Sequence, residues 1–216
     1  MPRAENRQSI VLDLLRTLRH GKTDAQIIGD AKHPGDDFID IHETYSWYRA
    51  IGCAKAPITI LEIGVRFGYA GIALIGGAVW AGVKSPSYVG IDAETDGIVS
   101  NTIALNNIID ACPVSRNGAS GGTAYIIKAN TRYVAAVNAA IAGQLFDIVH
   151  VDGDHSIQGV QNELSIASAA INPTGWILID DIDTPHIKDA ADKFCKSHGI
   201  IPLHVPTFHG LYLCCQ

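Results

Sequence analysis

The sequence predicts an α/β fold: one Rossmann-like, doubly wound sheet, mostly parallel, with an antiparallel hairpin at its carboxyl-terminal edge and helices at the amino terminus. From residue 57 onward, short apolar runs rich in β-branched residues alternate with longer stretches of helical periodicity, the pattern of a parallel sheet with crossover helices. The last two apolar runs, residues 200–204 and 211–214, are joined by too few residues for a parallel crossover. These two runs therefore predict the antiparallel hairpin.

The amino-terminal part of the chain lies outside this alternation. Apolar residues at helical spacing between residues 10 and 18 predict an amphipathic helix that ends at Gly21, and a second helix is expected from about residue 43 to residue 51. We expect residues 1–56 to form a helical cap over the sheet or over a site. Residues 57–216 should then form the Rossmann-like core of the same single domain.

The core is expected to contain five strands before the closing hairpin. Their predicted positions are residues 58–63, 88–92, 124–128, 145–149 and 176–179. The predicted helices are residues 68–81, 98–109, 133–142, 160–171 and 187–198. Apolar residues from Val160 to Ile171 share one face of the fourth helix, and residues 172–175 predict a turn into the fifth strand.

Composition and charge narrow the class of protein. Hydrophobic residues make up 47% of the 216 residues and charged residues only 18%, which excludes a disordered chain. The net charge of −6, without a basic cluster, argues against nucleic acid as a partner. The five cysteines form no C-x-x-C pair, so they fit a reducing compartment and predict neither a disulfide framework nor a zinc site.

Targeting signals are not apparent in the sequence. Asp13 and Arg16 interrupt the amino-terminal apolar run before it reaches the length of a signal peptide. No stretch is long and apolar enough to span a membrane. We therefore expect a cytoplasmic protein that does not interact with membranes.

Two of the predicted strands end in acidic turns. The fourth strand is followed by Asp152 and His155, and the fifth by Asp180 and Asp181. Ligands of open α/β sheets bind at the carboxyl ends of the strands, so both turns should face one crevice. Converging carboxylates repel one another unless a cation or shared protons relieve them, and hard oxygen ligands suit Mg²⁺ or Ca²⁺ better than zinc. Either turn alone is an ordinary strand end, but the two together predict a metal site.

A glycine-bearing loop follows the first strand. Gly64 and Gly68 allow a tight strand-to-helix turn and a close approach of the backbone to a ligand, and Asp92 ends the second strand, where it can accept hydrogen bonds from ribose hydroxyls. The glycines are spaced G-x-x-x-G-x-x-G, which does not fit the G-x-G-x-x-G of dinucleotide-binding enzymes. Glu62 would be unfavourable beside a pyrophosphate but suits a cationic ligand such as S-adenosylmethionine.

Two segments resemble a known family. Residues 61–70, LEIGVRFGYA, resemble motif I of the class I S-adenosylmethionine-dependent methyltransferases. Residues 146–155, FDIVHVDGDH, are similar to the metal-dependent O-methyltransferases, a group that includes catechol O-methyltransferase and the enzymes that methylate macrolide sugars. The resemblance covers about residues 57–183. His155 stands where the catechol branch has a lysine, and Ala70 where that branch has a serine.

The resemblance implies a role for each matched residue. The residues expected to bind the cofactor are Glu62, Gly64 and Gly68 at its methionine end, Asp92 at the ribose, Asn130 beside the adenine, and Asp152. The residues expected to bind the cation are Asp152, Asp180 and Asp181, and His155 is expected to be the general base. Asp154 and Asp183 are interpreted as surface turn residues. Asp154 is the alternative to His155 as the general base. His150 is interpreted as a core histidine rather than a ligand.

The sequence-based hypothesis is an S-adenosylmethionine-dependent O-methyltransferase. The expected cation is Mg²⁺, or another divalent ion such as Ca²⁺ or Mn²⁺, and the expected partner is a small molecule with a reactive hydroxyl, such as a sugar or a catechol-like vicinal diol. The sequence leaves the oligomeric state open, including a homo-oligomer. The alternatives are a non-catalytic module that binds S-adenosylmethionine and metal, and an NAD-dependent oxidoreductase.

Overall fold

The structure, a computed structural model, describes residues 38–93, 100–111, 122–205, 207 and 209–215. The amphipathic helix predicted between residues 10 and 18 lies outside these residues, as do the first two residues of the helix predicted at 98–109. No helix in the described part of the chain combines the length and the apolar character that a membrane span requires.

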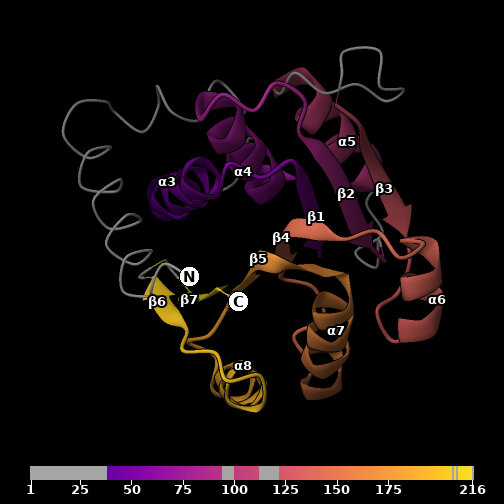
Figure 1. Cartoon of the computed structure of the whole chain (residues 1–216), viewed down its shortest axis with the longest axis vertical. Helices are drawn as coiled ribbons and strands as arrows, with labels where there is room; N and C mark the ends of the chain where they lie inside the picture. Colours follow the sequence, from indigo (N-terminus) through magenta and orange to yellow (C-terminus); the bar gives the residue numbers. More distant parts are fainter. Residues whose placement is uncertain (1–37, 94–99, 112–121, 206, 208, 216) are drawn as a thin grey trace.

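Seven strands of the described chain form one sheet. They are β1 (Thr59–Ile63), β2 (Ser87–Asp92), β3 (Ala124–Lys128), β4 (Phe146–Val151), β5 (Ile171–Ile179), β6 (Leu203–Val205) and β7 (Leu211–Cys215). Their order across the sheet is β3-β2-β1-β4-β5-β7-β6 (Figure 1). The first five strands pair in parallel, whereas β7 is antiparallel to both β5 and β6. The predicted fold class, including the antiparallel hairpin at the carboxyl-terminal edge, is confirmed.

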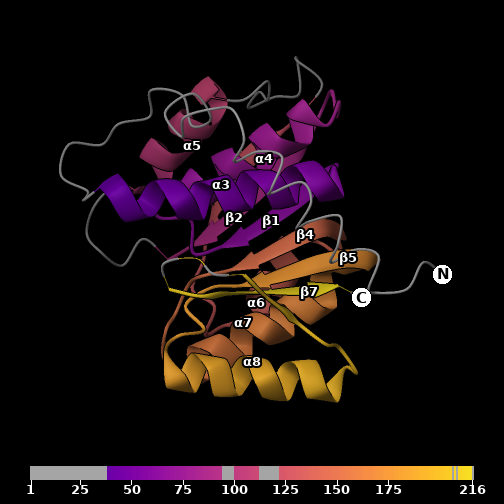
Figure 2. The same cartoon turned by 90° about the vertical axis from the view of Figure 1, so that its left-hand side faces the viewer.

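Helices cover both faces of the sheet. They are α3 (Phe38–Lys55), α4 (Tyr69–Trp80), α5 (Ser100–Ala111), α6 (Val134–Ala140), α7 (Ile157–Ala170) and α8 (Pro185–Ser197). Helices α3, α4 and α5 lie on one face, and α6, α7 and α8 lie on the other (Figure 2). Each layer packs against its own apolar cluster of the sheet. Strands β1 and β4 are therefore buried on both faces, which explains why they appear in the sequence as nearly continuous apolar runs.

The fifth strand begins earlier than the sequence predicts. Helix α7 ends at Ala170, and Ile171, which was predicted to end the helical stripe, has extended backbone angles and pairs with Phe146. Residues 172–175, predicted as a turn, belong to β5, where a shift of register accommodates them. Pro173 contributes to this difference, because it disfavours a helical conformation of Asn172, so the helix cannot continue past Ile171.

Helix α3 is held close to α4 by two glycines. A Cβ atom added to Gly77 would lie 2.1 Å from the carbonyl oxygen of Arg49, and one added to Gly52 would lie 2.2 Å from that of Leu74. No larger residue fits at either position without displacing the backbone of the other helix. This contact places α3 over the strands formed by the later part of the chain, although α3 itself precedes the alternating core.

The carboxyl ends of the central strands are joined by backbone hydrogen bonds. The N–H groups that follow β1, β4 and β5 each donate to the end of a neighbouring strand: Gly64 to Ile91 at 2.8 Å, Asp152 to Ile63 at 2.9 Å, and Asp180 to Val151 at 3.1 Å. The glycine-bearing loop and both acidic turns therefore meet at one edge of the sheet.

Candidate functional site

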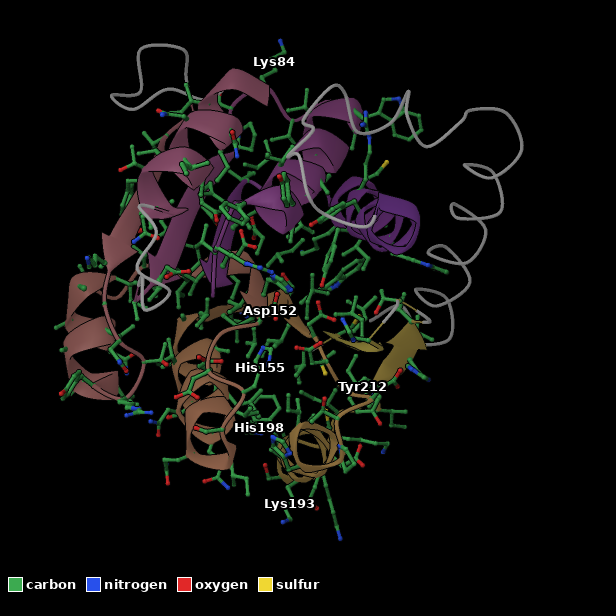
Figure 3. All side chains as sticks on the ribbon, turned by 180° about the vertical axis from the view of Figure 1, so that it is seen from behind. Lys84, Asp152, His155, Lys193, His198 and Tyr212 are labelled. Atoms are coloured by element: carbon green, nitrogen blue, oxygen red, sulfur yellow. The ribbon has the colours of Figure 1, made fainter. Side chains whose placement is uncertain are left out.

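Asp152, His155 and Asp181 meet at this edge. The His155 Nε2 atom lies 3.5 Å from Asp152 Oδ1 and 3.0 Å from Asp181 Oδ2, and one ligand atom from each residue falls within 4.8 Å of the others. In Figure 3, His155 lies just below Asp152 near the centre of the view. A small pocket that opens to solvent is lined by these residues and by Asp180. The structure thus brings the predicted base together with two of the three predicted metal ligands, whereas the third, Asp180, forms a second such group with His150 and Asp152.

Burial, and after it the proximity of the carboxylates to one another, raises the pKa values of Asp152 and Asp181. Burial raises the pKa of Asp152 to about 6, and Asp180 and Asp181 add to the rise, although His155 and His150 oppose it. The pKa of Asp181 is also raised, first by burial and then by Asp180. Proximity of like charges disfavours the ionised form of a carboxyl group, and a bound positive ion would offset the repulsion between these carboxylates. The donors are mainly carboxylate oxygens, which fits a small divalent cation such as Mg²⁺, Ca²⁺ or Mn²⁺.

His155 is half-exposed and bordered by negative charge. Its contact with Asp152 raises its pKa; burial opposes that rise and Asp181 adds to it, so the pKa reaches about 9. The His186 Nε2 atom donates a hydrogen bond of 2.7 Å to the carbonyl oxygen of His155, which fixes the turn from the side of α8. His209 approaches from the hairpin loop, with its Nδ1 atom 3.9 Å from Asp181 Oδ1. No sequence signal pointed to either of these two histidines.

A chain of buried polar groups runs behind the site. The Tyr48 hydroxyl donates to Asp180 Oδ2 at 2.6 Å and lies 3.0 Å from His150 Nε2, and His150 Nδ1 lies 3.4 Å from Glu62 Oε1. The other Glu62 carboxylate oxygen accepts the Tyr88 hydroxyl. Burial lowers the pKa of His150, but Glu62 and the nearby aspartates outweigh it and raise it to about 9. His150 is thus buried, as predicted of a core histidine, and it also lies within ligand distance of Asp152 and Asp180.

Asp92 supports the glycine-bearing loop from within, whereas Glu62 contacts buried groups behind it. Glu62 is 1% exposed and is surrounded by the polar groups just described. Asp92 Oδ2 accepts the backbone N–H groups of Val65 and Arg66, both at 2.9 Å. Gly64 and Gly68 have φ angles of 85° and 79°, which favour glycine and explain the residue type at both positions. The cofactor roles predicted for these four residues stay predictions.

Asn130 and Asp154 lie beside the site in the turns after β3 and β4. Asn130 Oδ1 accepts the N–H of Arg132 at 2.9 Å. Asp154 accepts the N–H of Ser156 at 2.9 Å and has the Arg132 Nε atom at 3.6 Å. These contacts agree with the interpretation of Asp154 as a turn residue, because its carboxylate pairs with Arg132.

Glu163 on α7 was not identified from the sequence. It is 1% exposed, and its Oε1 atom accepts the N–H of Asp154 at 2.7 Å and the hydroxyl of Thr131 at 3.0 Å. Burial raises the pKa of this carboxyl to about 7, although those hydrogen bonds oppose the rise. Glu163 thereby holds the turn that carries Asp152 and His155. A signal was present, because Glu163 lies three positions after Val160, on the apolar face of the helix.

Residues 61–182 match the family model described as a methyltransferase domain. A search of curated proteins by sequence finds no match.

Solved structures share the fold of this chain at low identity. The SAH-bound methyltransferase PaMTH1 of Podospora anserina is 16% identical, with a TM-score of 0.56 over 95% of this chain and 86% of its own. An O-methyltransferase of Bacillus cereus in complex with SAH is 14% identical, with a TM-score of 0.56 over 100% of this chain and 93% of its own. The O-methyltransferase TomG of Streptomyces achromogenes, involved in tomaymycin synthesis and solved with SAM, is 14% identical, with a TM-score of 0.56 over 94% of this chain and 89% of its own.

Proposed function

The chain belongs to the methyltransferase domain family, whose model matches more than half of its length, and from this premise we propose that it is an S-adenosylmethionine-dependent O-methyltransferase. The proposed acceptor is a hydroxyl of a small molecule, such as a sugar or a catechol-like vicinal diol. The observation that carries this proposal is the convergence of Asp152, Asp181 and His155 beside the loop of Gly64. The O-methyltransferases with bound SAH or SAM among the similar structures support it.

The proposed reaction needs an ionised oxygen nucleophile, because a neutral hydroxyl attacks a methyl group poorly. In this proposal His155 would accept the hydroxyl proton, and the pocket beside it opens to solvent. Asp152, Asp180 and Asp181 would hold a divalent cation, which would supply positive charge that favours the ionised hydroxyl. The Gly64 loop would bind the methyl donor, and positioning of donor and acceptor in line accounts for a large part of the rate.

Two assays test the proposal. Calorimetry should detect binding of S-adenosylmethionine and of its demethylated product but not of NAD. Methyl transfer from labelled S-adenosylmethionine to a panel of sugars and catechols should require Mg²⁺, should stop when a chelator is added, and should return with excess Mg²⁺. Undiminished transfer in excess chelator would contradict the cation requirement. Binding of S-adenosylmethionine without transfer to any hydroxyl would favour the non-catalytic module.

A further inference from the structure

Tyr48 reaches the acidic edge from outside the alternating core. It lies on α3, is 1% exposed, and donates its hydroxyl proton to Asp180 Oδ2 at 2.6 Å. The same hydroxyl oxygen lies 3.0 Å from His150 Nε2. The two residues that Tyr48 joins are 102 and 132 positions away in the sequence.

The Tyr48 ring is fixed in place by its surroundings. It packs edge-on against the His150 ring, with centroids 4.9 Å apart and an interplanar angle of 67°. The glycine contact between α3 and α4 sets the position of its backbone. A buried tyrosine usually satisfies its hydroxyl, and here the partner is a predicted metal ligand. The hydroxyl is thus held in place before any ligand binds.

The Asp180 carboxylate is held at both oxygens. Oδ2 accepts the Tyr48 hydroxyl, and Oδ1 accepts the N–H of Asp181 at 3.0 Å. Two hydrogen bonds fix the plane of the carboxylate, and each oxygen retains a lone pair for a further partner. On the basis of the proposed function, we propose that Tyr48 is a positioning residue that orients Asp180 for binding of the divalent cation.

This arrangement also distinguishes between two ligand sets. His150, Asp152 and Asp180 lie close enough together to hold an ion. However, the Tyr48 hydroxyl already contacts His150 Nε2 and Asp180 Oδ2, and His150 Nδ1 faces Glu62. An ion ligated by His150 Nε2 would displace the Tyr48 hydroxyl. Tyr48 therefore favours cation binding through the carboxylates at this edge of the sheet, with His150 as its buried support.

The test is the affinity of the full chain for Mg²⁺ or Mn²⁺ alone, measured by calorimetry for the wild type and for Tyr48→Phe. Removing a hydrogen bond to a metal ligand typically weakens metal binding by about 10- to 100-fold, and we expect a loss of this size. Tyr212→Phe is the matched control, because it also removes the hydroxyl of a buried tyrosine that donates to a carboxylate, but to Asp192, outside the polar chain behind the site. Its cation affinity should stay close to that of the wild type, although both substitutions should lower Tm.

A second measurement on the wild type does not depend on the variant folding. With tyrosine labelled at the ring carbon that bears the hydroxyl, the Tyr48 resonance should shift when Mg²⁺ is added, because its acceptor Asp180 gains a new partner. Unchanged cation affinity in a folded Tyr48→Phe protein, or an unmoved Tyr48 resonance while the cation binds, would overturn the inference alone. A wild type that binds no cation would overturn both the inference and the proposed metal dependence. Cation binding weakened by Tyr48→Phe in a protein without transferase activity would uphold the inference and refute the proposed function.

Discussion

Gly64 lies directly against the backbone of Asp152: a Cβ atom at position 64 would stand 2.0 Å from the Asp152 carbonyl oxygen. The glycine-bearing loop after β1 and the acidic turn after β4 are therefore one packed unit. A change in the loop is transmitted to the turn, because neither backbone has room to yield independently. This contact explains how the proposed cofactor loop and the proposed cation site can be held in fixed register at the edge of one sheet.

Gly64→Ala should damage both halves of the site. The substitution introduces a clash with Asp152 and a side chain at a φ angle of 85°, where L-residues are strained. We expect weaker binding of both S-adenosylmethionine and Mg²⁺, measured by calorimetry, together with a lower Tm. Gly76→Ala is the control, because a Cβ atom there meets nothing within 4 Å and alanine favours the helix by up to about 1 kcal/mol. Equal behaviour of the two variants would contradict the coupling of loop and turn.

His155→Ala should remove the base without disturbing cofactor binding. Loss of a general base lowers the catalytic rate by about 10²–10⁴, and the affinity for S-adenosylmethionine should barely change. The wild-type rate should rise with pH as His155 loses its proton, and this dependence should be absent from the variant. Steady-state kinetics across a pH series measure both effects. Near-normal turnover with the wild-type pH profile would show that another group accepts the proton.

Mg²⁺ should lower the pKa of His155. Asp152 and Asp181 hold this pKa near 9, and a pKa that high would keep the imidazole protonated at neutral pH. A cation shared by the same carboxylates would offset their charge, so the pKa should fall towards its ordinary value of 6.5.

Histidine NMR titrations with and without Mg²⁺ test this expectation independently of turnover. His198, which follows the last residue of α8, serves as an internal control. His186, in the first turn of that helix, is unsuitable because it contacts His155. A His155 titration that is identical in the presence of bound Mg²⁺ would contradict the shared use of these carboxylates.

The parts of this fold that sequence could predict are those with local signals. Strands β1 and β4 are buried on both faces, so their apolar runs are visible in a few residues, and the acidic turns follow directly from them. The convergence of Asp152 and Asp181 followed from one rule about carboxyl ends of parallel strands. Ile171 was assigned to the wrong element because an apolar residue at a helix end fits both periodicities.

The parts that sequence could not predict depend on distant contacts. Tyr48 becomes part of the site only because two glycines bring α3 against α4, and no local pattern records that approach. Similarly, His209 reaches Asp181 through the closing hairpin, whose path depends on the whole sheet. Hydrogen bonds between residues more than a hundred positions apart are set by tertiary packing, which periodicity does not encode.

Glu163 makes stability depend on pH in a direction that can be tested. Its pKa is raised by burial from 4.5 to about 7, so the folded state binds its proton more tightly than the unfolded state does. Its contribution to the free energy of unfolding is therefore fully present below the unfolded pKa and is lost as the pH rises through the folded pKa. Glu163→Gln keeps the shape of the side chain but cannot ionise, so it lacks this loss.

Urea unfolding of both proteins at about pH 5 and about pH 8 isolates the effect of Glu163, because the other titrating groups are common to both. Relative to the wild type, Glu163→Gln should become more stable as the pH rises. Glu163→Ala should instead be destabilised by about 1–3 kcal/mol at the lower pH, because the buried N–H of Asp154 loses its acceptor. A difference between wild type and Glu163→Gln that stays constant with pH would show that the carboxyl of Glu163 has no raised pKa in the folded protein.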